Sequence, residues 1–288
     1  MTRQSRFSKF LPKRKPDTHK GDYGHVLVLA GSPGWTGAAY LCSQGALLSG
    51  SGLVTLGIPK SLNSIMAVKL TEVMTKLLPE TGAGTLSLNA YDEILKFIDK
   101  VDVVAIGPGL STHKETVRLV RRLITSISKP IVIDADGLNA LAGNTGLLKK
   151  VIGPVVITPH PGEMARLVGI STSEIQKDRK AIALKAAKEY NLTVVLKGYR
   201  SVVVDQSGKV YVNITGNPGM ATGGTGDILT GMIASFIGQG ISVFDAARLG
   251  VYLHGMAGDL AAKALGEVSL AAGDILRYLP KAIKTNTG

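Results

Sequence analysis

A glycine-rich stretch, residues 216–227, holds the residues of this sequence best suited to chemistry. It ends in Asp227 and continues into residues 228–237, an apolar segment with helical spacing. A glycine-rich loop that opens a helix leaves backbone N–H groups unpaired at the N-terminus of the helix, where the helix dipole also favours an anion. Because glycine has no Cβ, the backbone of such a loop can approach a phosphate closely. The stretch therefore predicts a phosphate-binding loop.

The candidate anion hole in this loop consists of Gly223, Gly224, Thr225 and Gly226, and Asp227 follows it. A carboxylate repels phosphate, so Asp227 is a poor phosphate ligand. It is better suited to act as a general base that takes a proton from a hydroxyl, while the loop N–H groups stabilise the charge on a transferred phosphoryl group. The alternative is that Asp227 only caps the helix, because aspartate is a common N-cap residue.

Apolar runs that alternate with helical patterns predict the fold class. Runs typical of buried strands begin near residues 26, 53, 101, 130, 155 and 193, and a hairpin of residues 202–204 and 210–213 follows. Helices are predicted over residues 38–49, 61–70, 88–98, 115–126, 174–190, 243–264 and 269–283. Residues 72–84 show no regular pattern. The alternation predicts an α/β protein, a single domain over residues 1–288, with a central mostly parallel sheet and helices on both faces.

Candidate side chains collect at the ends of the predicted strands. Gly31, Gly107, Asp134, His160 and Lys197 all lie at such ends. Since ligands of parallel sheets bind at the carboxyl ends of the strands, these positions predict one shared cleft. Prolines on both sides of His160 restrict its loop, so the imidazole is held for a ligand or serves the structure alone. Lys197 could bind a phosphate as a point charge.

Two carboxylates, Asp134 and Asp136, follow the predicted strand that begins near residue 130. Such a pair could ligate Mg²⁺. It could equally cap the next helix. The sequence offers no third ligand beside them, so it assigns no metal ligands.

The composition limits the classes of partner and compartment. The chain has 288 residues, a formal net charge of +12 and only 5% aromatic residues. Because the basic residues are scattered and no nucleic-acid motif is present, we expect anionic small-molecule ligands and no nucleic acid. No apolar run is long enough to span a membrane, and the N-terminus does not read as a signal peptide. The single cysteine, Cys42, lies in an apolar helical run, which predicts a core position and a reducing cytoplasm.

Several motifs resemble those of the ribokinase-like superfamily, and more specifically of the ADP/ATP-dependent NAD(P)H-hydrate dehydratases. They span nearly the whole chain and include residues 217–231, the Thr-Pro-His-Pro-Gly-Glu run of 158–163, the Gly-Pro-Gly turn of 107–109, and the Lys-Gly of 197–198. Ser201 stands where the family more often has threonine. The resemblance implies a ribokinase-like fold with a strand near residues 72–84. It implies substrate contacts at Ala38, Gly109, His160 and Asp227, and nucleotide contacts at Lys197, Gly198, Tyr199, Arg200, Ser201 and Gly226.

The activity that this resemblance implies is the repair of hydrated NADH or NADPH. A terminal phosphoryl group passes from ADP or ATP, with Mg²⁺ assisting, to the hydroxyl of (6S)-NAD(P)H-hydrate, which Asp227 deprotonates. Phosphate then leaves more easily than hydroxide would, and NAD(P)H is restored with release of AMP or ADP. ADP and ATP remain alternatives because both present the same phosphates to a backbone loop. The resemblance also implies a homotetramer and a stand-alone dehydratase domain without the epimerase domain of larger members.

Two other functions fit parts of the sequence. A small-molecule kinase of the same superfamily, such as a hydroxyethylthiazole kinase, would have a similar Gly-Thr-Gly-Asp loop. A nucleotide-binding sensor without catalysis would also keep the glycines. The motifs at residues 158–163 and 217–224 favour the dehydratase over the kinase, and Asp227 argues against the sensor, which needs no base.

Overall fold

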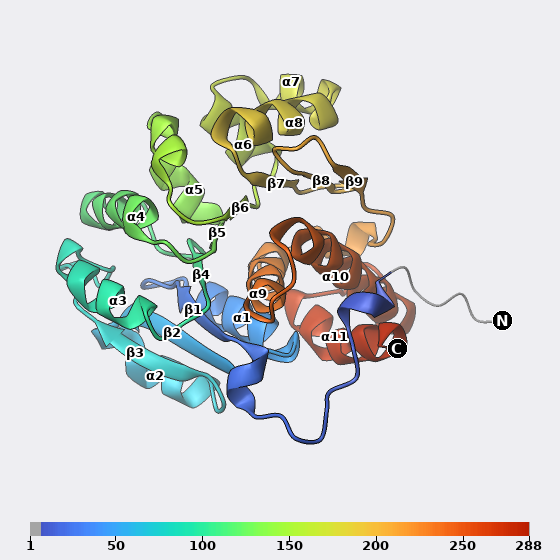
Figure 1. The fold of residues 1–288 in the computed structure, drawn as a ribbon, viewed down its shortest axis with the longest axis horizontal. Coiled ribbons are helices and arrows are strands. Elements are labelled where there is room, and N and C mark those ends of the chain that lie inside the picture. Colours follow the sequence, from blue (N-terminus) through green and yellow to red (C-terminus); the bar gives the residue numbers. More distant parts are fainter. Residues whose placement is uncertain (1–6, 288) are drawn as a thin grey trace.

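The computed structural model describes residues 7–287. Within them, nine strands form one sheet in the order β3-β2-β1-β4-β5-β6-β7-β8-β9 (Figure 1). The strands are β1 (His25–Leu29), β2 (Leu53–Pro59), β3 (Met74–Leu78), β4 (Val103–Ile106), β5 (Ile131–Ile133), β6 (Val155–Ile157), β7 (Thr193–Leu196), β8 (Val202–Val204) and β9 (Val210–Val212). The first seven run parallel to their neighbours, whereas β8 is antiparallel to β7 and β9. The predicted mostly parallel α/β sheet is confirmed.

Helices cover both faces of this sheet (Figure 1), as predicted. One face carries α1 (Thr36–Leu48), α2 (Asn63–Lys69), α9 (Thr225–Gly238), α10 (Val243–Leu265) and α11 (Ala272–Asn286). The other carries α3 (Tyr91–Ile98), α4 (Lys114–Ser126), α5 (Ala135–Leu141), α6 (Pro161–Val168), α7 (Thr172–Lys177) and α8 (Arg179–Tyr190). Short 3₁₀ helices span Ser8–Phe10, Lys20–Tyr23, Lys60–Leu62, Leu88–Ala90, Thr145–Lys150 and Pro218–Met220. None of the helices in residues 7–287 is both long and apolar enough to cross a membrane.

The strands have apolar side chains on both sides because each face has its own core. Along β1, Val26 and Val28 belong to the cluster under α1 and α9, whereas Leu27 and Leu29 belong to the cluster on the opposite face. Successive side chains of a strand point to opposite faces, so a strand buried on both sides reads as a continuous apolar run.

Helix α9, which follows the glycine-rich loop, is the most enclosed helix of its face. Every residue from 228 to 237 is buried. Small residues let α1 pack closely against it: a Cβ at Gly45 would lie 2.5 Å from the carbonyl oxygen of Ile228. A Cβ at Gly231 would lie 1.9 Å from the carbonyl oxygen of Cys42. The backbones of α1 and α9 are therefore in direct contact, and Cys42 has the predicted core position.

Two predicted helices differ from the structure, and one segment without a local pattern contains a strand. Residues 72–84 contain β3, the strand that the resemblance implied, at the edge of the sheet, where its partly exposed side chains give no clear pattern. The single helix predicted over residues 174–190 is two helices, α7 and α8, because Asp178 leaves the helical conformation and its carboxylate accepts a hydrogen bond from the Ala181 N–H at 2.9 Å. Helix α1 begins at Thr36 instead of Ala38.

The contact between α1 and α9 predicts the effect of adding one methyl group. Gly231→Ala places its Cβ against backbone, which cannot rotate away, so we expect the free energy of unfolding to fall by about 1–3 kcal/mol or more. Gly273→Ala is the matched control, because nothing lies within 4 Å of a Cβ at that helical position. We expect it to be neutral or stabilising by up to about 1 kcal/mol. Urea unfolding of both variants measures the difference, and equal stabilities would contradict the close contact.

Candidate active site

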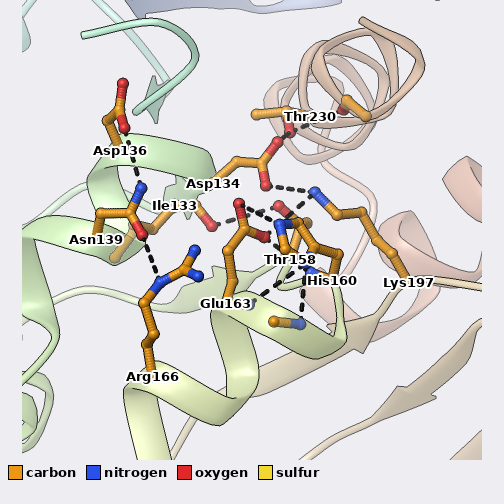
Figure 2. A network of polar contacts seen from close by, with 12 residues as sticks. Ile133, Asp134, Asp136, Asn139, Thr158, His160, Glu163, Arg166, Lys197 and Thr230 are labelled. Atoms are coloured by element: carbon orange, nitrogen blue, oxygen red, sulfur yellow. Dashed lines mark hydrogen bonds and ion pairs between the residues drawn. The ribbon is translucent and has the colours of Figure 1, made fainter. Parts of the chain in front are cut away.

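A buried ion pair joins the ends of two strands to helix α9. Lys197, directly after β7, places its Nζ 2.7 Å from Oδ1 of Asp134, which directly follows β5. The Thr230 hydroxyl on α9 donates to the other oxygen, Oδ2, also at 2.7 Å (Figure 2). Asp134 is only 1% exposed, so both of its oxygens are paired inside the protein. Burial alone would lower the pKa of Lys197, but the charges of Asp134 and Glu163 outweigh it and raise that pKa, so the lysine is charged.

The carboxylates of Asp134 and Asp136 have different hydrogen-bond partners. Asp134 occupies the N-cap position of α5, but its side chain makes no capping hydrogen bond. Asp136 accepts from the Ser111 N–H at 2.9 Å. It also accepts from the Asn139 amide at 3.0 Å (Figure 2). The capping interpretation therefore does not describe the Asp134 side chain, and the Mg²⁺ interpretation of the pair stays a prediction. The Asp134 carboxylate instead forms the ion pair with Lys197 at the end of β7.

His160 is held in place by the helix that it begins. It is the N-cap residue of α6, and its Nδ1 accepts hydrogen bonds from the N–H groups of Gly162 and Glu163. The Glu163 carboxylate accepts from the His160 N–H at 2.8 Å and completes a capping box. Burial lowers the pKa of His160, and the positive charges of Lys197 and Arg166 lower it further, so the imidazole is neutral near pH 7. Because Nδ1 accepts, the proton lies on Nε2.

Asp227 lies in the first turn of α9 but does not cap it. The N-cap residue is Gly224, with φ +91°, so the capping interpretation of Asp227 is wrong. Its carboxylate has no hydrogen-bond partner within residues 7–287. Burial raises its pKa to about 7, and the negative charge of Asp134 contributes in the same direction, while Lys197 opposes the shift. A carboxylate with this pKa can take up a proton at neutral pH.

The glycine-rich loop is held at several points. The Asp259 carboxylate accepts from the N–H of Gly216 and from the Asn217 amide, each at 2.9 Å. At the other end, His254 Nε2 bonds the carbonyl oxygen of Thr225 at 2.9 Å. Burial lowers the pKa of His254 to about 4, so the ring is neutral and donates this bond. Side chains of α10 thus hold the loop at both ends.

The predicted anion hole has open donors. Among residues 7–287, the N–H groups of Gly223, Gly224, Thr225 and Gly226 have no backbone acceptor. The Lys197 ammonium lies beside this turn, since a Cβ added to Gly226 would be 3.2 Å from its Nζ. Open N–H groups at a helix start, with a cation next to them, form a site suited to phosphate.

A cavity of about 740 Å³ opens beside this turn. The residues predicted for the nucleotide are all in its lining: Lys197, Gly198, Tyr199, Arg200, Ser201 and Gly226. The remaining lining comes mainly from residues 213–221 and from α10. This grouping agrees with the prediction of one nucleotide site.

The residues predicted for the substrate lie outside that lining. Gly109, with φ +63°, adjoins Ala38, since a Cβ added to Gly109 would lie 3.1 Å from the Ala38 Cβ. His160 and Asp227 are likewise absent from the cavity wall. Gly226, which lines the cavity, is bonded directly to Asp227. The predicted base thus lies next to the nucleotide cavity without facing into it.

Comparison with known proteins decides the family. The family described as NAD(P)H-hydrate dehydratase matches residues 26–281. This chain belongs to the NAD(P)H-hydrate dehydratase family. The bifunctional NAD(P)H-hydrate repair enzyme of Moorella thermoacetica is 52% identical over 274 residues, which are 95% of this chain and 52% of that protein. The ADP-dependent (S)-NAD(P)H-hydrate dehydratase of Neisseria meningitidis is 35% identical over 94% of this chain and 88% of that protein.

A solved dehydratase has the same fold. The ADP/ATP-dependent NAD(P)H-hydrate dehydratase of Bacillus subtilis, crystallised with ATP and Mg²⁺, is 33% identical, with a TM-score of 0.81 over 96% of this chain and 94% of that chain. The ribokinase-like fold and the resemblance to the dehydratases are therefore confirmed. The chain spans about half the length of the bifunctional relatives that it matches.

Sequence reasoning missed two side chains that shape the site of this dehydratase-family chain. Thr230 is a polar residue in an otherwise apolar helical run, which was the available signal that it bonds a buried partner. Arg179 donates to the carbonyl oxygens of Leu196, Lys197 and Tyr199, and nothing in the local pattern distinguished it from other basic residues of its helix.

The capping role of His160 predicts how two substitutions differ. His160→Ala removes the side-chain acceptor at the start of α6, so we expect a loss of about 0.5–2 kcal/mol in the free energy of unfolding. His160→Asn should lose far less, because asparagine is a preferred N-cap residue. Thermal unfolding of the two variants compares them. Equal losses would show that the cap does not hold this loop.

Proposed function

We propose that this protein catalyses the ADP- or ATP-dependent dehydration of (6S)-NADH-hydrate or (6S)-NADPH-hydrate to NADH or NADPH. The family supplies the substrate class. The observation that carries the proposal is Asp227, a carboxylate without a hydrogen-bond partner within residues 7–287 and with a pKa of about 7, at the helix start that offers open N–H donors. Beside it lies a cavity large enough for a nucleotide.

In this mechanism Asp227 accepts the proton of the ring hydroxyl while the hydroxyl oxygen attacks the terminal phosphorus of the nucleotide. The bond between that phosphorus and the leaving nucleotide breaks, and AMP or ADP departs. The N–H groups of the turn formed by residues 223–226 stabilise the charge of the phosphoryl group. The carbon–oxygen bond of the new phosphate ester then breaks, and phosphate leaves with the electron pair of that bond, helped by the lone pair of the ring nitrogen. Loss of a proton from the adjacent ring carbon restores the double bond.

The residues present fit Mg²⁺ only as an ion bound chiefly by the nucleotide. Within residues 7–287, no group of three or more His, Cys, Asp or Glu side chains is arranged to hold a metal. Mg²⁺ commonly keeps several waters and uses one or two carboxylates together with substrate phosphates. Asp134 and Glu163 supply such carboxylates near Lys197, although each already accepts hydrogen bonds from the protein. When bound, the ion would neutralise phosphate charge.

The dehydratase is favoured over the two alternative functions. The family match covers the chain from β1 into α11 and carries the dehydratase description, which supports it over a small-molecule kinase. A sensor has no use for a carboxylate whose pKa is about 7 and which faces no partner within residues 7–287. We also propose a cytoplasmic homotetramer, as the resemblance implies, which gel filtration with light scattering would test.

The direct test is recovery of NADH absorbance from purified NADH-hydrate with Mg²⁺ and either ADP or ATP. We expect recovery to require the nucleotide and to release one phosphate for each NADH formed. The same assay with the two nucleotides identifies the donor. Nucleotide binding without phosphate release or NADH recovery would refute the enzyme and support the sensor. The folded His160→Asn variant should show a raised KM for the hydrate if the imidazole contacts the substrate.

Asp227→Asn tests the base. General-base catalysis contributes about 10²–10⁴-fold, so kcat should fall by that factor. For the wild type, kcat/KM should rise as the pH increases through about 7, where Asp227 loses its proton. A near wild-type rate for the variant would exclude Asp227 as the base.

The stability of the same variant provides a control for folding. The pKa of Asp227 is raised in the folded protein, so the folded state holds this proton more tightly than the unfolded state. Wild-type stability therefore decreases as the pH rises from about 4 to about 7. Asparagine has no such ionisation. We expect Asp227→Asn to be more stable than the wild type at pH 8 and similar to it at pH 4, so lost activity at pH 8 would not reflect unfolding.

A further inference from the structure

Arg179, the first residue of α8, binds the backbone of the turn between β7 and β8. Its Nη2 donates to the carbonyl oxygens of Leu196 at 2.8 Å and Lys197 at 3.0 Å. Its Nη1 donates to the carbonyl oxygen of Tyr199. One guanidinium thus holds three carbonyl groups within four residues. Arg179 itself does not line the 740 Å³ cavity, whereas Lys197 and Tyr199 do.

The backbone of this turn has an uncommon shape. Gly198 has φ +135° and Arg200 has φ +52°. Residues other than glycine rarely adopt a positive φ. A Cβ at Gly198 would lie 3.1 Å from Nη2 of Arg179, so the glycine also makes room for the guanidinium. A strained turn persists only where its surroundings hold it, and the contacts of Arg179 supply that support.

The direction of the carbonyls fixes the direction of the next N–H groups. In a trans peptide the C=O and N–H point to opposite sides of the same plane. Since the carbonyls of Lys197 and Tyr199 face Arg179, the N–H groups of Gly198 and Arg200 point away from it. Neither N–H has a backbone acceptor within residues 7–287. Both residues line the cavity, so these two donors are available to a ligand there.

We propose that Arg179 is a positioning residue for the nucleotide, which aims the N–H groups of Gly198 and Arg200 at the phosphate of the bound adenylate. The proposal rests on the nucleotide site of the proposed function. Neighbouring N–H groups in a turn of mixed handedness form a concave anion site. The planar fork of arginine carries five donors in fixed geometry, whereas lysine offers a single ammonium, so the role depends on the shape of the side chain as well as its charge.

The experiment compares AMP with adenosine, because the two differ only in the phosphate. Isothermal titration gives both dissociation constants for the wild type, Arg179→Gln, Arg179→Lys and Lys180→Gln. Lys180 is the matched control, being the exposed basic neighbour on the same helix. We expect Arg179→Gln to weaken AMP binding by about 10–100-fold, the effect of lost hydrogen bonds to a charged group, and adenosine binding by less than about threefold. Arg179→Lys should restore only part of the loss, and Lys180→Gln should change nothing.

Other outcomes overturn the proposal. If Arg179→Gln weakens AMP and adenosine equally, or neither of them, Arg179 only supports the fold. If Arg179→Lys restores AMP binding completely, the effect depends on the positive charge and not on the orientation of the two N–H groups. If Arg179→Gln does not fold, Gly198→Ala disturbs the same turn from the other side and should show the same selective loss of AMP binding. A wild type that binds no AMP would refute the nucleotide site itself, whereas normal wild-type binding with unchanged selectivity in the variants would refute only the role of Arg179.

Discussion

The ion pair between Asp134 and Lys197 is the interaction on which the rest of the site depends. It joins the ends of β5 and β7, and Thr230 ties α9 to the same carboxylate. Burying two charges is costly, and the cost is offset only where the geometry is good and the remaining lone pairs are satisfied. Both oxygens of Asp134 meet that condition. The pair therefore fixes the glycine-rich turn of α9 relative to the end of β7, where the cavity-lining residues 197–201 begin.

The same pair contributes to the acidity of Asp227. Burial is the largest reason for its raised pKa, and the nearby charge of Asp134 adds to it, while Lys197 limits the rise. The proposed base thus owes its raised pKa to burial and to a charge that also takes part in a structural ion pair. Burial and the charge of Asp134 therefore make the ionised form of Asp227 unfavourable, and its carboxylate has no hydrogen-bond partner within residues 7–287.

The sequence predicted the parts of this structure that leave a local pattern. Buried strands, the glycine-rich helix start and the residues at strand ends all follow from residue type and spacing. The six residues that the family resemblance assigned to the nucleotide line one cavity. The bond between Thr230 and Asp134 joins positions 96 residues apart, and no local pattern records it. The local pattern did not show strand β3, which only the family resemblance implied, because its side chains are partly exposed at the sheet edge. The break at Asp178 was missed because helical spacing continues on both sides of it.

The direct backbone contact between α1 and α9 has a consequence for the relative position of the groups in the proposed reaction. Helix α1 carries Ala38, a proposed substrate contact, and α9 carries Asp227, the proposed base. No side chain separates the two helices at Gly45 and Gly231, so neither can slide without a clash. In the proposed reaction the spacing between Ala38 and Asp227 would be set by this scaffold, and fixed spacing of reacting groups lowers a barrier. Proton transfer in such a site should be insensitive to solvent viscosity.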